Sequence, residues 1–238
     1  MFTPEHVAGA FGCIAHALGG IDGASYTNSR EAFLESRRRG FRLMEVDLFA
    51  TADDQIVCFH ECKTASLGLR RPPLETTRNE FLAARYDGKH APLDARQLFE
   101  VWSESDDLFL ITDTKNDNRR ILPRLIDLAR RFPPTLLNRL IPQVYSRDDL
   151  DNIQRLGVFE TIIFTRYLCD YNDDQIVELA QTSRVAMIAM VPEHYSENLK
   201  QRLHAEGCGV YLHTINDEQR ATALRREGVG VYTDFLSP

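Results

Sequence analysis

The chain has 238 residues, of which 43% are apolar, 26% charged and 9% aromatic. This composition is typical of a folded globular protein and excludes a disordered or collagen-like chain. The 28 basic and 35 acidic residues give a net charge of −7, so a general nucleic-acid binder or a protein bound to anionic membranes is not expected. An anionic substrate remains compatible with this charge, because a bound metal ion can reverse the charge of a site locally.

The sequence shows no targeting or membrane segment. No apolar stretch approaches the roughly 20 residues that a membrane-spanning helix needs. The first 12 residues lack the basic and apolar regions of a secretory signal. We therefore expect a cytoplasmic protein without an integral membrane segment, and the sequence leaves its oligomeric state open.

Short apolar runs alternate with amphipathic segments along the chain. The runs that predict β-strands are 12–17, 42–48, 55–60, 108–114, 139–145, 161–165, 184–190, 209–214 and 230–234. Most are almost continuously apolar, as are strands that a parallel sheet buries on both faces. Between the runs, we expect Asn28, Asp94 and Ser146 to cap the beginnings of helices, because short polar side chains accept hydrogen bonds from the first turn.

The count of strands predicts the fold. Residues 51–55 are polar and favour a tight turn, which folds the third run back onto the second. These two runs then form one unit, and eight units separated by helices predict a single-domain (β/α)8 TIM barrel over residues 1–238. A doubly wound sheet is the competing fold, but no glycine-rich phosphate loop follows the first run. Residues 61–93 break the alternation and are expected to form a loop insertion with one short helix.

Polar residues stand at the carboxyl ends of several predicted strands, where the active sites of such barrels lie. They are His16, Glu45, Asp47, His60, Asp113 and Lys115, and His213 ends a later strand. Glu45 and Asp47 are two residues apart and therefore share one face of their strand. His16 and His60 are candidates for an acid and a base, because imidazole titrates near neutral pH.

The carboxylates favour a metal site. Glu45, Asp47 and Asp113 offer the oxygen ligands that one hard divalent cation prefers, so Mg²⁺, Ca²⁺ or Mn²⁺ is expected rather than Zn²⁺. The alternative is an ion network without metal, in which Glu45 and Asp47 pair with Lys115, Arg42 or Arg70. Composition alone does not decide between the two.

Seven short motifs occur in order along nearly the whole chain, most clearly over residues 12–62. They lie in IAHALGG, YTNSREAF, GFRLMEVDLFATADDQIVCFHE, APLDARQLFEVW, LITDTK, YLHTIN and GVYTDFLSP. In this order they resemble the motifs of the glycerophosphodiester phosphodiesterases: a His-Arg opening, an Asn-Thr helix start, a Glu-x-Asp pair with a His-Asp pair, and a Glu-x-Lys strand. The last two resemble that family's Trp-Thr-Val-Asn strand and its closing Thr-Asp-x-Pro.

The resemblance implies a TIM barrel that cleaves a small-molecule phosphodiester of lipid metabolism. It implies a divalent metal, Mg²⁺, Ca²⁺ or Mn²⁺, that Glu45, Asp47 and Asp113 hold. It also implies that His16 and His60 are the general acid and base. By the same resemblance Lys115 contacts the phosphate.

The sequence departs from the family's pattern around the substrate. Ala17 stands where the family has the arginine that grips the phosphate, so this contact is either missing or comes from another group, with Arg42, Lys63 and Arg70 as candidates. His213 replaces a pocket tryptophan, and we expect it and Arg42 to contact the substrate.

Two further positions differ. Asp113 is one methylene group shorter than the family's glutamate, and Glu61 replaces the aspartate that follows the second histidine. We therefore expect a divergent phosphodiesterase. Two alternatives stay open: a glycerophosphoryl transferase or phospholipase C-like enzyme of lipid or surface-glycan metabolism, and a non-catalytic barrel that binds a phosphorylated ligand.

Overall fold

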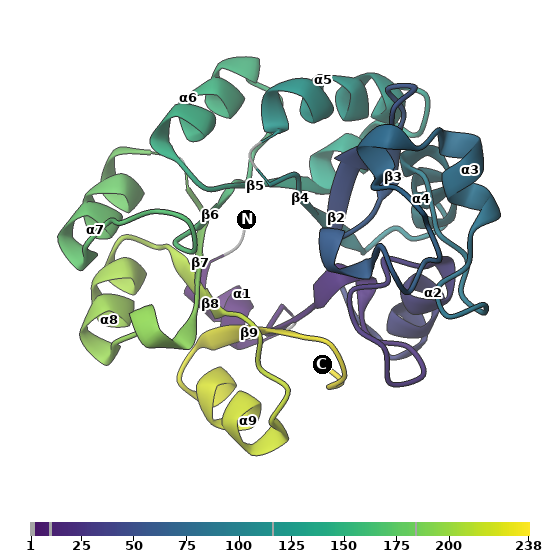
Figure 1. Ribbon diagram of the computed structural model, residues 1–238. Helices are drawn as coiled ribbons and strands as arrows, with labels where there is room; N and C mark the ends of the chain where they lie inside the picture. Colours follow the sequence, from purple (N-terminus) through teal and green to yellow (C-terminus); the bar gives the residue numbers. More distant parts are fainter. Residues whose placement is uncertain (1–2, 10, 116, 184) are drawn as a thin grey trace.

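Eight parallel strands close into a barrel, and helices surround it (Figure 1). The computed structural model describes residues 3–9, 11–115, 117–183 and 185–238. The barrel strands are Cys13–Ala15 (β1), Leu43–Ala50 (β2), Phe109–Asp113 (β4), Leu140–Val144 (β5), Ile163–Thr165 (β6), Met187–Met190 (β7), Gly209–Leu212 (β8) and Val229–Thr233 (β9). Neighbours in this order pair in parallel, and β1 also pairs with β9, which closes the barrel. The predicted TIM barrel is confirmed.

The remaining strand, Ile56–Cys58 (β3), lies outside the barrel. It pairs antiparallel with β2, and Cys58 lies opposite Leu48. The hydroxyl of Thr51 accepts a hydrogen bond from the backbone N–H of Gln55 at 3.0 Å, which closes the turn between the two strands. The predicted fold-back of the third run is therefore confirmed. Each of the other predicted runs overlaps a barrel strand, although residue 184, which begins the run 184–190, is outside the described residues.

The α-helices alternate with the barrel strands. They are Pro4–Ala8 (α1), Arg30–Arg38 (α2), Arg78–Ala83 (α3), Ala95–Trp102 (α4), Asn118–Ala129 (α5), Arg147–Leu156 (α6), Asp173–Thr182 (α7), Glu197–Ala205 (α8) and Glu218–Arg226 (α9). Asp94 and Ser146 cap α4 and α6, as predicted. The predicted cap of α2 was wrong by one residue: Ser29 is the cap, and Asn28 binds Asp47 instead.

Residues 61–93 form the predicted insertion. It contains the short helix α3 and two 3-10 turns, Glu61–Lys63 and Pro73–Glu75. A separate apolar cluster, in which Phe59, Phe81 and Tyr86 are buried, fixes it beside β3. The insertion therefore begins directly after His60 and packs along β3.

Apolar side chains fill the interior of the barrel below the site. Ile14, Leu43, Ile111, Ile141, Ile163, Met187 and Tyr211 form one buried cluster, which Val7 of α1 joins. This packed layer forms a floor, so any cavity at the carboxyl ends of the strands is closed from below. In the part of the chain that the structure describes, no helix combines the length and the apolar character that crossing a membrane requires.

Candidate active site

The strand geometry places polar side chains directly above the apolar floor. Residues two apart on a strand face the same side, and Ile14, Leu43, Ile111 and Tyr211 are each followed two positions later by a predicted site residue. These are His16, Glu45, Asp113 and His213. The site therefore continues the inward-facing rows of the barrel core.

A cavity of ≈ 460 Å³ opens between these side chains. The predicted residues that line it are His16, Glu45, His60, Asp113, Lys115 and His213, and the tyrosines that line it are Tyr26, Tyr145, Tyr167 and Tyr232. Asp47 joins them through its contacts with Glu45 and Asp113. The structure thus brings together all but one of the predicted site residues.

Arg42 is the exception: it does not line the cavity, so the structure does not support its predicted contact with the substrate. It precedes β2 and therefore lies at the amino end of the strand, across the floor from the cavity. Its guanidinium pairs with Asp107 at 3.3 Å and lies over the ring of Phe11 at 5.1 Å. Arg42 stabilises the opposite end of the barrel.

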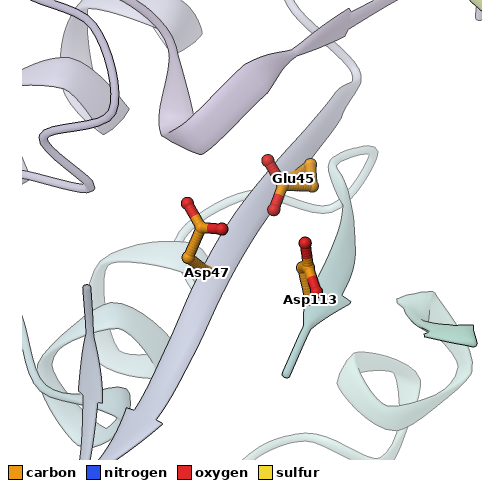
Figure 2. A group of neighbouring side chains, drawn as sticks. All are labelled: Glu45, Asp47 and Asp113. Atoms are coloured by element: carbon orange, nitrogen blue, oxygen red, sulfur yellow. The ribbon is translucent and has the colours of Figure 1, made fainter. Parts of the chain in front are cut away.

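Three carboxylates converge on one point (Figure 2). Glu45, Asp47 and Asp113 each offer an oxygen, and these three atoms lie within 4.8 Å of one another. All three side chains are buried, and Asp47 lies directly opposite Asp113 on the neighbouring strand. Burial and the charge of Asp47 raise the pKa of Glu45 to about 8. The group is therefore costly to ionise fully without a positive charge between its members.

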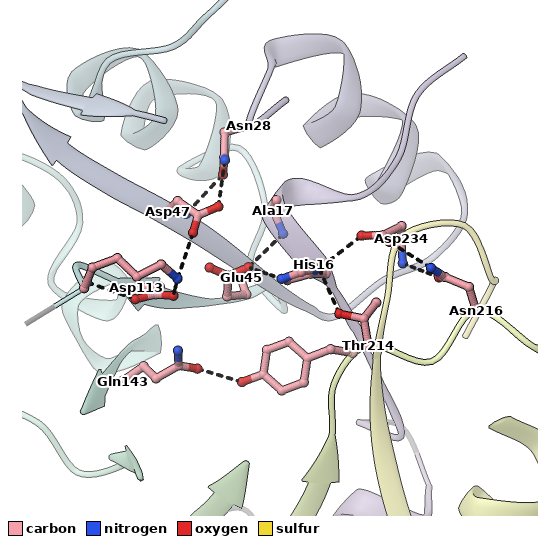
Figure 3. A network of polar contacts seen from close by, with 12 residues as sticks. His16, Ala17, Asn28, Glu45, Asp47, Asp113, Gln143, Thr214, Asn216 and Asp234 are labelled. Carbon is pink, nitrogen blue, oxygen red and sulfur yellow. Dashed lines mark hydrogen bonds and ion pairs between the residues drawn. The ribbon is translucent and has the colours of Figure 1, made fainter. Parts of the chain in front are cut away.

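The donor atoms of this group fit a divalent cation. Glu45 Oε1 and Asp47 Oδ1 are buried and accept no hydrogen bond. The other oxygen of each of these two residues is held in place: the backbone N–H of Ala17 donates to Glu45 Oε2 at 2.7 Å, and Asn28 Nδ2 donates to Asp47 Oδ2 at 2.9 Å (Figure 3). Both oxygens of Asp113 accept hydrogen bonds from Lys115 or Tyr145. Oriented oxygens with unused lone pairs are the ligands that Mg²⁺, Ca²⁺ and Mn²⁺ prefer.

Lys115 contributes a positive charge beside the carboxylates. Its ammonium group binds Asp113 and lies 3.4 Å from Asp47 Oδ1. Burial lowers the pKa of Lys115, but the charges of Asp113, Asp47 and Glu45 raise it more, so that the lysine remains charged. Part of the alternative ion network is therefore present, although Arg42 and the exposed Arg70 are outside it.

His16 is oriented by a carboxylate that the sequence analysis did not assign. Its Nδ1 lies 3.0 Å from Asp234 Oδ1, and its Nε2 lies 3.9 Å from Glu45 Oε2 (Figure 3). Burial lowers the pKa of His16, but the hydrogen bond to Asp234 and the charges of Glu45, Asp234 and Asp47 raise it above its usual value. The protonated ring, with Nε2–H toward the carboxylates, is therefore favoured.

His60 has the opposite environment. Its Nδ1 accepts the backbone N–H of Cys62 at 3.2 Å, so the neutral ring carries its proton on Nε2. Burial lowers the pKa of His60. The pKa values of the two histidines are therefore shifted in opposite directions, upward for His16 and downward for His60.

His213 lies on the far wall of the cavity, at the end of β8. Its ring contacts Tyr167 and Tyr232 edge to face, with centroid distances of 5.8 and 5.9 Å. Burial, and then the charges of His16 and Lys115, lower its pKa to about 4. His213 therefore offers a neutral ring to this side of the cavity.

Sequence reasoning missed several residues that hold the site. Asp234 lies in the closing motif GVYTDFLSP, which the sequence analysis identified. Nothing in the sequence indicated that its carboxylate would bind His16. Tyr145 donates to Asp113 Oδ2 at 2.7 Å. Its position two residues after Gln143, on a row of side chains that faces the barrel interior, could have identified it as a site residue. Asn28 was read as a helix cap, because the same side chain suits both roles.

The chain matches known proteins in structure, whereas comparisons of its sequence find no match. Neither a protein-family model nor a curated protein sequence matches the chain. Solved structures do match. A glycerophosphodiester phosphodiesterase from Thermotoga maritima is 22% identical, with a TM-score of 0.73, over 94% of this chain and 94% of that one. The chain has the fold of that enzyme.

Two further structures agree. A phosphodiesterase from Oleispira antarctica, in complex with the product sn-glycerol-3-phosphate, is 17% identical with a TM-score of 0.78, over 96% of this chain and 95% of that one. A glycerophosphodiester phosphodiesterase from Parabacteroides distasonis is 17% identical with a TM-score of 0.73, over 93% and 92%. At these identities the likeness establishes the shared barrel, and the chemistry has to be argued from this chain's own residues.

Proposed function

We propose that this chain is a divergent glycerophosphodiester phosphodiesterase, which hydrolyses a small-molecule phosphodiester with a divalent metal and histidine acid/base catalysis. The observation that carries the proposal is the position of His16 Nε2, 3.9 Å from Glu45 within a buried group of three carboxylates. A proton donor and a site for a hard cation thus meet in one cavity. The motif resemblance and the fold of solved phosphodiesterases support the same reaction.

Glu45, Asp47 and Asp113 are the proposed ligands of one cation, Mg²⁺, Ca²⁺ or Mn²⁺. When bound, such an ion supplies Lewis-acid stabilisation for the negative charge that grows on the phosphoryl oxygens. Asn28 and the backbone of Ala17 hold two of these carboxylates in place. A group of three carboxylates suits hard divalent cations as a class and does not select one ion among them.

His16 is the proposed group that transfers a proton to the leaving oxygen. Asp234 holds Nδ1–H, so Nε2 is the nitrogen that gives and regains the proton. A histidine placed in this way contributes about 10²–10⁴-fold to a rate. The raised pKa of His16 favours the protonated form that an acid needs.

His60 is the proposed second member of the pair. In the tautomer that Cys62 fixes, it donates Nε2–H to a phosphoryl oxygen. To accept a proton at Nε2, the ring must first carry its proton on Nδ1, which breaks the contact with Cys62. Lys115 is the proposed phosphate contact, and His213 the proposed contact of the alcohol.

A non-catalytic barrel is the second candidate, and Ala17 is the observation that favours it. The residue is fully buried and presents only its backbone to the site, so no arginine grips the phosphate from this position. The two candidates differ in turnover. A barrel that only binds a phosphorylated ligand will release no alcohol from any diester.

The test compares wild type with His16→Gln and with His204→Gln, a histidine on α8 outside the cavity. ³¹P NMR follows glycerophosphodiesters with and without an alcohol acceptor. We expect a phosphomonoester product, a loss of at least about 10²-fold in His16→Gln, and full activity in His204→Gln. A new diester that forms with the acceptor identifies a transferase, and equal rates in all three proteins contradict the role of His16.

A further inference from the structure

The loop between β1 and α2 holds its backbone in an unusual conformation where it meets the site. Eight of the described non-glycine residues have positive φ angles, and four of them lie at the site: Ala17, Tyr26 and Asn28 in this loop, and Lys115 after β4, with φ of 50°, 57°, 46° and 48°. Non-glycine residues rarely adopt this region, and bulky ones are true outliers there. Such residues persist where the surrounding structure determines them, and they gather at functional sites.

Three of these four residues already have a partner in the site. Ala17 donates to Glu45, Asn28 binds Asp47, and Lys115 binds Asp113. At these three positions the backbone conformation thus accompanies a polar group that is directed at one member of the carboxylate group. Tyr26 is the fourth, and the proposed chemistry above gives it no role.

Tyr26 contacts both histidines. Its ring centroid lies 4.5 Å from that of His16 at an interplanar angle of 76°, and 4.8 Å from that of His60 at 62°. Both are edge-to-face arrangements, which favour defined ring orientations. In the described part of the chain, no other aromatic ring packs against both of these imidazoles.

The hydroxyl end of Tyr26 reaches the groups that orient His16. It interacts with the side chain of Thr214, whose Oγ1 lies 3.4 Å from His16 Nδ1. Burial and the charge of Asp234 raise the pKa of Tyr26 to about 12, so the hydroxyl stays protonated. The half-buried Tyr26 side chain therefore contacts both His16, near its Asp234 partner, and His60, which lines the cavity.

We propose that Tyr26 is a positioning residue, whose ring fixes the orientations of His16 and His60 so that both Nε2 atoms face the cavity. Asp234 and Cys62 each hold one Nδ1 atom, but a single hydrogen bond leaves a ring free to tilt about it. Edge-to-face contact with Tyr26 restricts that tilt on both rings at once. This role rests on the proposed function of the two histidines.

The test uses Tyr26→Leu, Tyr26→Phe and Tyr26→Gly, with Tyr195→Leu as the matched control. Tyr195 is also half-buried, but it binds Glu197 outside the cavity. Glycine suits the positive φ of position 26, so Tyr26→Gly removes the ring while it relieves the backbone. The first readout is the set of nuclear Overhauser contacts between the His16 and His60 ring protons and their neighbours, recorded beside the chemical shifts. It needs no substrate, and these contacts report ring orientation, whereas loss of the Tyr26 ring current alone changes the shifts.

We expect Tyr26→Leu and Tyr26→Gly to change the Overhauser contacts of the His16 and His60 rings and to lower kcat on the order of 10²-fold, since small displacements of reacting groups have effects of this size. KM should change by less than about threefold, because the ring acts on the chemical step and not on ground-state binding. Tyr26→Phe should restore both readouts, and Tyr195→Leu should leave them unchanged.

Unchanged Overhauser contacts of the His16 and His60 rings in Tyr26→Leu and Tyr26→Gly would overturn the proposal, even if activity fell. A Tyr26→Phe variant as impaired as Tyr26→Leu would also overturn it, because the hydroxyl and not the ring would then matter. A wild type without phosphodiesterase activity refutes the proposed function instead. In that case the Overhauser contacts still decide whether Tyr26 orients the two rings.

Discussion

Asp234 Oδ1 lies 3.0 Å from Nδ1 of His16, although 218 positions separate the two residues in the sequence. The first and last strands of the barrel pair with each other, which brings the beginning and the end of the chain together. Asn216 donates to the other carboxylate oxygen of Asp234 at 2.8 Å and fixes its orientation. The closure of the barrel therefore assembles the proposed acid.

The first prediction concerns this pair. Asp234→Asn removes the charge that stabilises the imidazolium form of His16, so the pKa of His16 should fall. The pH at which kcat/KM changes with the protonation of His16 should move down by about one unit or more, and kcat should fall on the order of 10²-fold. A rate profile from pH 5 to 9 measures both effects. A profile identical to that of wild type would show that Asp234 does not act on His16.

The second prediction concerns the support of the carboxylates. Asn28 donates to Asp47 Oδ2 and accepts the backbone N–H of Asp47 at 3.1 Å. Removing such a support typically weakens metal binding by about 10–100-fold. We expect this loss in Asn28→Ala, measured by calorimetric titration with Mn²⁺. Asn152→Ala, on the exposed face of α6, is the control, and equal affinities in the two variants would contradict the role of Asn28.

The third prediction concerns acid stability. His213 has a pKa of about 4 in the folded protein because it is buried, against an ordinary value of 6.5. Between these pH values the unfolded chain binds a proton that the folded protein does not, so stability falls as the pH falls. His213→Gln lacks this titration. The melting temperature of wild type should therefore drop more steeply from pH 7 to pH 4 than that of His213→Gln, and parallel curves would contradict the assignment.

The sequence predicts the barrel well because its strands are buried on both faces. Continuous apolar runs then mark each strand, and the polar residue at each carboxyl end marks the site, as His16 and Asp113 show. The position of Arg42 could have been inferred from the sequence, because it is the first residue of the predicted strand 42–48 and the site lies at the carboxyl ends of the strands. Arg42 precedes β2, so it lies at the amino end.

Contacts between distant segments could not be predicted. The partner of His16 comes from the other end of the chain, and a helix-capping pattern at Asn28 does not reveal that its side chain turns toward Asp47. The role of Tyr26 depends on a backbone angle that no residue pattern encodes. These parts of the site follow from closure of the barrel and from the β1–α2 loop.

The most direct test of the central claim is metal-dependent turnover by chelator-treated protein. Hydrolysis of bis(p-nitrophenyl) phosphate and glycerophosphocholine is measured before and after addition of Mg²⁺, Ca²⁺ or Mn²⁺, in wild type and in Glu45→Gln. We predict activity only with added metal, a higher melting temperature in its presence, and loss of both responses in Glu45→Gln. Turnover that is equal with and without metal, or a Glu45→Gln variant that responds as wild type does, would contradict the proposed site.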